Sequence, residues 1–245
     1  MLAFFCSAVA SPLMAQNVAS LMRQAEAFEK AFNDEAALKK YIEVLKYDPL
    51  NIDALCKTSE LYNIIGKRRS TKEEQKEYYK TGESFARKAI KINPNHSEAN
   101  FAMAISMGRM ALISSGKEKV VAVKEIKTYA DKCIQLDAKN FKGYHVLGKW
   151  HYEVSDLNAF ERWIVKITYG GLPHSSLDDA IKNYEKSRQL SPGFLLNYLE
   201  LAKAYKRKGE INKARALLEQ LQKLPPSASD DVKIKSLGRK LLDDL

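Results

Sequence analysis

Four short segments recur along the chain at points where one helical pattern ends and another begins. They read "YDPLNIDA" (47–54), "INPNHSEA" (92–99), "LDAKNFKG" (136–143) and "LSPGFLLN" (190–197), and the third has an alanine where the others have a proline. A proline cannot continue the preceding helix, but it is tolerated where the next helix starts. The recurrence therefore predicts a chain of successive helical units of similar design.

The last unit shows the period most clearly, because Pro192 and Pro226 are 34 residues apart. This is the period of the tetratricopeptide repeat, a pair of helices that stacks on its neighbours. Counted from Leu195, large residues fall where helices meet and small ones where helices approach closely, as in that repeat. These landmarks are Tyr198, Leu201, Ala202, Tyr205, Gly209, Ala214, Leu218 and Leu221. The sequence thus resembles tetratricopeptide-repeat proteins, which implies a right-handed superhelix with a concave inner face.

We predict an all-α fold, a tetratricopeptide-like solenoid that forms a single domain over residues 16–245. The chain has only 11 glycines and 7 prolines in 245 residues, which favours long helices over many short strands. The three middle units exceed the standard period, so each carries an insertion that we expect in the loop between its paired helices. The predicted units are 18–51, 52–96, 97–140, 141–194 and 195–228, followed by a capping helix over 230–245.

The N-terminal segment "MLAFFCSAVASPLMAQ" is apolar, carries no charge and contains small residues near its end. This pattern is typical of a secretory signal peptide, which we place at residues 1–15 although the usual positive region is missing. The alternatives are a true start further upstream or an uncleaved apolar first turn. The interpretation predicts an exported protein of a bacterium, periplasmic or associated with a membrane.

Motifs for catalysis, metals and cofactors do not emerge from the sequence. His145 and His151 are six positions apart, so on a helix they point about 240° away from each other, whereas a helical zinc site uses ligands four positions apart. The nucleophile-elbow and phosphate-loop motifs are missing. Cys56 and Cys133 lie in apolar helical patterns and are predicted to be buried free thiols. We therefore expect no enzyme, no metal and no cofactor.

The net charge of +10 is spread along the chain with no block of six like charges, so no nucleic acid partner is expected. In tetratricopeptide repeats the first helix of each unit faces the inner groove, and the family frame can be carried over onto this sequence. It gives as groove residues Phe101, Ile105, Arg109, Lys142, His145, Lys149, Tyr152, Leu196, Leu199, Lys203, Lys206 and Arg207.

Six of these groove residues are lysines or arginines, and they accompany an apolar floor. Clustered cations in a concave surface would attract a carboxylate or a phosphate group. The alternative is that they are ordinary solvated charges on helix surfaces. If they bind, two partners fit: an acidic or C-terminal peptide segment of a protein, or an anionic lipid or membrane surface.

The segment "GKWHYEVSDLNAFERW" (148–163) joins two patterns. Its first half places Trp150 and Val154 on one apolar helix face and Gly148 where helices cross closely. Its second half begins an amphipathic insertion. We expect the apolar residues of this insertion to cover the edge of the groove as a lid: Leu157, Phe160, Trp163 and Ile164.

A closer resemblance extends over about 60% of the chain. The motifs "GKWHYEV" (148–154), "LNAFERW" (157–163), "LSPGFLLNYLELAK" (190–203) and "NPNHSEANFAMAISMGRMA" (93–111) resemble the regulator of microtubule dynamics family. The resemblance implies a helical-repeat interaction domain without catalytic activity, whose eukaryotic relatives are linked to microtubules and organelle membranes and for whose fold lipid binding is proposed. An exported bacterial relative would meet no microtubules. We therefore predict a non-enzymatic scaffold that binds a peptide or protein in its groove, with carriage of an anionic lipid or other amphiphile as the alternative.

Overall fold

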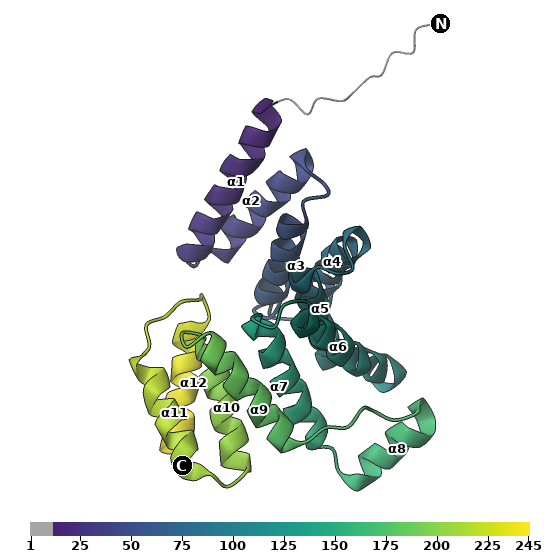
Figure 1. Ribbon diagram of the computed structural model, residues 1–245, viewed down its shortest axis with the longest axis vertical. Helices are drawn as coiled ribbons and strands as arrows, with labels where there is room; N and C mark the ends of the chain where they lie inside the picture. The colour runs from purple at the N-terminus through teal and green to yellow at the C-terminus, as the bar shows by residue number, and fades with distance from the viewer. Residues whose placement is uncertain (1–11) are drawn as a thin grey trace, which may run out of the picture.

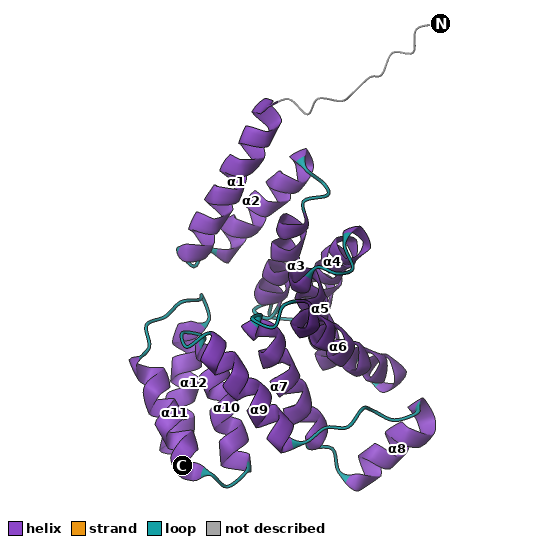
Figure 2. Cartoon of the chain, in the orientation of Figure 1, coloured by secondary structure: helices purple, strands orange, loops and turns teal. Residues whose placement is uncertain are grey.

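The computed structural model describes residues 12–245, which form helices joined by turns and loops, with no strand in this part of the chain (Figures 1 and 2). None of its helices is both long and apolar enough to cross a membrane. The predicted signal peptide lies mostly outside the described residues. The helices are α1 (Pro12–Lys30), α2 (Asp34–Tyr47), α3 (Ile52–Gly66), α4 (Lys72–Ile92), α5 (Ser97–Ile113), α6 (Gly116–Leu136), α7 (Phe141–Ser155), α8 (Ala159–Tyr169), α9 (Leu177–Leu190), α10 (Leu195–Arg207), α11 (Ile211–Lys223) and α12 (Asp231–Asp243).

The helices pack as five pairs, which are α1 with α2, α3 with α4, α5 with α6, α7 with α9, and α10 with α11. The first helix of each pair also packs on the pair before it. At the C-terminal end α12 lies against α10 and α11 (Figure 1). The predicted all-α, tetratricopeptide-like architecture with a C-terminal capping helix is therefore confirmed.

The recurring segments supply the residues that start the helices. In the first three, Asn51, His96 and Asn140 accept a hydrogen bond from a backbone N–H in the first turn of α3, α5 and α7. Such caps satisfy backbone donors that a helix leaves open at its N-terminus. In the fourth segment Phe194 stands at this position without a side-chain cap.

The insertions of the middle units do not lie in loops as expected. In the second and third units they lengthen the second helix of the pair, so that α4 and α6 reach 21 residues each. In the fourth unit the insertion forms a helix of its own, α8, between the paired α7 and α9. Reciprocal capping boxes, Thr71 with Glu74 and Asn158 with Glu161, start α4 and α8 and help explain why these insertions are helical.

Small residues allow the paired helices to approach closely around large buried side chains. A Cβ atom on Gly148 would lie only 2.6 Å from the ring of Tyr184, so α7 and α9 could not cross there with any other residue. Tyr184 itself is fully buried, as are Tyr41 and Tyr198. The predicted close crossing at Gly148 is confirmed. Cys56 and Cys133 are free and buried, as predicted.

The two ends of the stack touch each other. In the loop between α11 and α12, Asp230 accepts hydrogen bonds from Lys67 at 2.5 Å and from Arg68 at 3.0 Å, both in the turn after α3. Ser229 donates to Asp34, the first residue of α2, at 2.6 Å, and Arg68 pairs with the same carboxylate at 2.7 Å. We call these five residues the clasp. In Figure 1 this loop lies next to the lower ends of α1 and α2, so the superhelix closes on itself.

Candidate functional site

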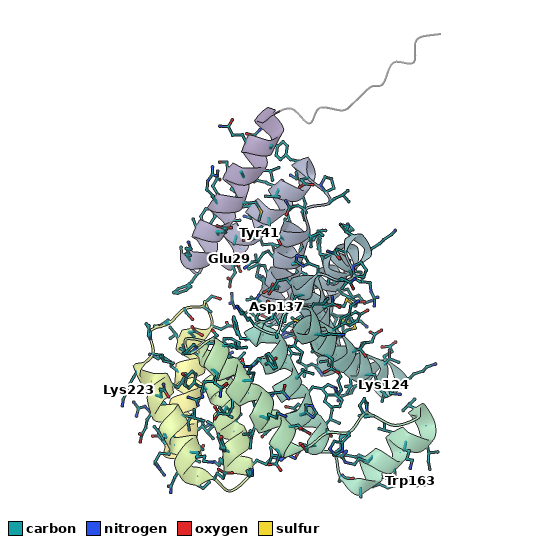
Figure 3. All side chains as sticks on the ribbon, in the orientation of Figure 1. Glu29, Tyr41, Lys124, Asp137, Trp163 and Lys223 are labelled. Atoms are coloured by element: carbon teal, nitrogen blue, oxygen red, sulfur yellow. The ribbon has the colours of Figure 1, made fainter. Side chains whose placement is uncertain are left out.

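A pocket of about 240 Å³ opens where the first helices of successive units converge. Its walls come from α1, α2, α3, α5 and α7, and we call it the inner pocket. Figure 3 labels Glu29 and Tyr41 next to it, at the point where α1 and α2 approach α3. The residues that line it are Met22, Glu26, Tyr41, Asp53, Cys56, Lys57, Glu60, Glu98 and Lys142.

The inner pocket combines apolar surface with an excess of negative charge. Four of its lining residues are carboxylates and two are lysines. Tyr41 donates a hydrogen bond to Glu29 at 2.6 Å, and Lys57 donates to the same carboxylate at 3.0 Å. Burial and the neighbouring Glu29 raise the pKa of the Tyr41 hydroxyl, so it is neutral and acts as a donor.

The thiol of Cys56 forms part of the pocket wall. Burial raises its pKa well above the usual range, and the carboxylates of Glu60 and Glu98 add to this effect. Since the thiolate is the nucleophilic form of cysteine, a thiol that stays protonated at neutral pH is poorly suited to attack a substrate. Within residues 12–245 no three His, Cys, Asp or Glu side chains gather in a way that could hold a metal ion.

Lys142 spans three units from its place at the start of α7. Its Nζ atom lies 2.8 Å from Glu98 Oε2 and 3.2 Å from Glu60 Oε2, and 4.6 Å from the centre of the Phe101 ring. Burial alone would lower the pKa of Lys142, but the two carboxylates raise it above its usual value, so the lysine stays charged. The predicted groove cation is therefore already neutralised by the chain's own carboxylates.

The predicted cations on α7 and α10 are also bound within the protein. Lys149 and Lys203 both pair with Glu200, at 2.7 and 2.6 Å. Arg207 donates to the carbonyl oxygen of Tyr152 at 2.7 Å and lies over the ring of that residue. Lys206 donates to a backbone carbonyl near the end of α12. These side chains tie neighbouring helices together and do not form an open cationic floor.

Three other predicted groove residues lie in the interior. Phe101, His145 and Leu199 are 6%, 8% and 2% exposed, because the tight superhelix covers these faces with the next unit. The Nδ1 atom of His145 lies 2.9 Å from the side-chain oxygen of Asn197, which joins α7 to α10. Burial lowers the pKa of His145 and favours its neutral form. Ile105 and Leu196 are half-buried.

Arg109, near the end of α5, differs from the other five predicted cations. It forms no hydrogen bond or ion pair with any residue that the structure describes, and its buried Nε atom has no partner. Burial lowers its pKa, while Tyr79 and Asp230 of the clasp act in the opposite direction. Of the six predicted cations, Arg109 is therefore the one without a polar partner among the described residues.

The residues predicted to form a lid lie on or next to α8, away from the inner pocket. The structure shows this helix as a spur at the edge of α6, where Lys124 donates to the carbonyl of Tyr169 at 2.8 Å (Figures 1 and 3). Arg162 of α8 also donates to the carbonyl of Val154 in α7 at 2.8 Å. Phe160, Trp163 and Ile164 are exposed to solvent, and Leu157 is half-buried. Here α8 covers no part of the inner pocket.

Sequence reasoning missed most of the residues that do line the pocket. The groove frame was carried onto the third, fourth and fifth units only. The first two recurring segments are 45 residues apart. Moved back by 45 residues, the third-unit positions Phe101 and Ile105 fall on Cys56 and Glu60, which both line the pocket, whereas Arg109 falls on Ile64, which does not. The signal was therefore present in the sequence.

The model of the family described as regulator of microtubule dynamics protein 1-3 matches residues 21–245. Regulator of microtubule dynamics protein 3 from rat is 24% identical over 180 residues, which are 73% of this chain and 38% of the rat protein. Protein 1 from cattle is 27% identical over 70% of this chain and 55% of its own length. Protein 1 from Caenorhabditis elegans is 26% identical over 66% of this chain and 71% of its own. The chain thus spans about half or less of the two mammalian relatives.

Solved structures share the fold at low sequence identity. A thermophilic tetratricopeptide-repeat protein of Thermus thermophilus superposes with a TM-score of 0.69 at 11% identity, over 92% of this chain and 98% of that one. The Pseudomonas aeruginosa protein pilF superposes with a TM-score of 0.56 at 13% identity, over 94% and 86%. Such helical-repeat scaffolds typically bind proteins on their concave surfaces. The paired helices, the repeat period and the match over residues 21–245 together show that this chain belongs to the regulator of microtubule dynamics family.

Proposed function

We propose that this protein is a non-enzymatic scaffold that binds a peptide segment of a protein partner in the inner pocket. The observation that carries the proposal is the pocket itself, which has an apolar wall, lies on the concave side of a helical-repeat scaffold and receives residues from four successive units. A peptide that enters it would contact all four units at once. Cys56, the thiol in the wall, has a raised pKa and does not suit catalysis.

The charge of the pocket favours a segment with a lysine or arginine side chain. Four carboxylates and two lysines line the pocket, and both lysines already pair with carboxylates of the chain. A cationic side chain would therefore meet a complementary potential. The sequence predicted an acidic peptide as partner. Such a peptide would have to compete with the chain's own carboxylates at each predicted groove cation that forms an ion pair. Among these cations, only Arg109 has no hydrogen-bond partner in the described part of the chain.

An anionic lipid or other amphiphile in the same groove is the second candidate from the sequence. Its head group would face the pocket carboxylates, and no feature of the inner pocket favours that arrangement over a peptide. Export of the protein, which the apolar N-terminal run suggests, is also part of the proposal. It would limit the partners to those outside the cytoplasm.

The proposal is tested with three pools of dye-labelled decapeptides. The pools share the same apolar positions and differ in two polar positions, which are lysine, glutamine or glutamate. Fluorescence anisotropy with the purified protein should give the tightest binding for the lysine pool. The double variant Glu26→Gln/Asp53→Asn removes two pocket carboxylates that are exposed at the rim, and we expect it to weaken binding of this pool at least fivefold. The matched control, Glu77→Gln/Glu219→Gln, removes two carboxylates elsewhere on the surface and should bind as the wild type does.

Two outcomes would contradict the proposal. One is equal binding of the three pools, or tightest binding of the glutamate pool. The other is an anionic lipid that mass spectrometry finds in stoichiometric amount after solvent extraction of the purified protein, since this would favour the lipid alternative.

A further inference from the structure

The helix α8 carries an apolar stripe that nothing in the described chain covers. Phe160 and Ile167 are 67% and 64% exposed, Trp163 is 57% exposed and Ile164 is 38% exposed. These positions are i, i+3, i+4 and i+7, so they fall on one side of the helix within an arc of about 100°. The rings of Phe160 and Trp163 are stacked 6.1 Å apart, so they form one continuous surface. We call these four residues the α8 stripe.

The stripe contributes nothing to the core. No residue of α8 is buried, and its N-terminus is held by the capping box of Asn158 and Glu161. Its C-terminus ends at Gly170, whose φ of 74° suits glycine and stops the helix. A helix that is capped at both ends and presents aromatic side chains to solvent has an apolar surface of the kind that marks an interaction site.

Uncompensated positive charge surrounds the stripe. Lys124 reaches the carbonyl of Tyr169, and Gly116 lies near the hydroxyl of the same tyrosine, so the start of α6 flanks the end of α8. Figure 3 shows Lys124 and Trp163 in the same corner of the molecule. The two segments, 116–124 and 158–170, hold five cations and two carboxylates. The five cations are Lys117, Lys119, Lys124, Arg162 and Lys166. None of them pairs with a carboxylate within residues 12–245, although Lys124 and Arg162 donate to backbone carbonyls.

We propose that the α8 stripe docks on a membrane surface of anionic lipid. A short helix with bulky apolar residues on one side and cations beside it is the pattern of helices that lie in the membrane interface, where aromatic rings enter the head-group region. The free lysines at the start of α6 complement the negative lipid surface. This site is separate from the inner pocket and uses none of its residues.

The test uses sedimentation with vesicles of phosphatidylcholine alone and of phosphatidylcholine with 30% phosphatidylglycerol. We expect the full chain to bind the anionic vesicles and to bind the neutral ones at least tenfold more weakly. Tryptophan emission should shift to shorter wavelength on binding. Trp150 is 3% exposed and already buried, so the shift reports on Trp163.

Two variants and a matched control examine the two parts of the site. Phe160→Ser/Trp163→Ser should lower the partition coefficient on anionic vesicles at least tenfold. Lys117→Gln/Lys119→Gln should lower it roughly 25-fold, since each lysine near an anionic surface contributes about fivefold. Val232→Ser/Leu237→Ser removes exposed apolar residues from α12 instead and should leave partitioning unchanged. All variants should keep the thermal melting temperature of the wild type within a few degrees.

The proposal is overturned if neutral and anionic vesicles bind equally, or if the α12 control loses as much binding as the α8 variant. It is also overturned if neither vesicle binds. In that case a dimer in light scattering that Phe160→Ser/Trp163→Ser abolishes would identify a second copy of the chain as the occupant, and a monomer would point to a protein partner.

Discussion

The α7–α10 interface and α8 use the same kinds of side chain in opposite ways. At the interface Lys149 and Lys203 share the carboxylate of Glu200, and the neighbouring Trp150 of α7 is buried against α6. On α8 the cations have no carboxylate partner among the residues that the structure describes, and Trp163 is open to solvent. Lysines and aromatics on a repeat helix therefore do not identify a binding surface. What separates the two regions is whether the charges and rings find their partners within the chain.

The strongest contrast is between the two tryptophans. Trp150→Ala should lower the free energy of unfolding by about 4 kcal/mol, since it empties a buried site and removes the hydrogen bond from Nε1 to the carbonyl of Val123. Trp163→Ala should change it by less than about 0.5 kcal/mol because the side chain packs on nothing buried. Urea unfolding followed by circular dichroism measures both. Equal losses in the two variants would mean that α8 is part of the core.

A smaller loss of unfolding free energy is expected when Glu200, the carboxylate shared by Lys149 and Lys203, is removed. Glu200→Ala should cost about 2 kcal/mol of unfolding free energy, because it removes a largely buried carboxylate, breaks the ion pair of Lys203 and leaves Lys149 with the exposed Glu153 alone. Lys213→Ala, which breaks an exposed pair with Glu210, is the control and should cost less than about 0.5 kcal/mol. A Glu200 variant as stable as this control would show that the interface charges are ordinary surface pairs.

Glu200 should also make the stability of the protein depend on pH. Burial would raise the pKa of Glu200, but Lys149 and Lys203 lower it below the unfolded value of 4.5. A depressed carboxyl pKa stabilises the folded state above the unfolded pKa, and this contribution is lost as the pH falls through the folded pKa. The stability difference between the wild type and Glu200→Gln should therefore be largest above about pH 5 and shrink below pH 4.5. A difference that stays constant down to pH 3 would contradict the assignment.

The smallest effect is expected at the clasp. Asp230→Asn keeps the shape of the side chain but removes the charge that pairs with Lys67 and Arg68, and it should lower the unfolding free energy by about 1 kcal/mol. Hydrogen exchange should speed up in the loop between α11 and α12 and at the start of α2. Asp243→Asn, at the exposed end of α12, is the control. Unchanged exchange at α2 in the Asp230 variant would show that the clasp does not hold the two ends together.

Much of the fold could be predicted from the sequence because the information is local. Helix caps such as Asn51 and Asn140 lie within three residues of the groups they bind, and the 34-residue spacing fixes how units follow one another. The insertions were expected in loops because insertions in helical repeats usually map to the loops between paired helices. The capping boxes at Thr71 and Asn158 were present in the sequence and would have indicated helices.

The site could be predicted only in part, since it depends on the pitch of the superhelix. Lys142 pairs with Glu60, which is 82 positions away, and the repeat pattern of the sequence does not predict this contact. The frame can name the face of a helix, but whether Phe101 or Leu199 on that face stays open depends on how tightly the next unit covers it. For the same reason the cations were predicted to be free when most are paired.

The clasp also bears on how the chain comes apart. In an open solenoid each unit touches only its neighbours, so the end units can fray one at a time while the middle stays folded. Here Asp34 in the first pair and Ser229 beside the cap hold each other at 2.6 Å, so neither end is a true terminus of the stack. The first pair of helices cannot separate from the stack until the clasp contacts with the loop before α12 break. Unfolding from either end therefore has to begin with the opening of the clasp.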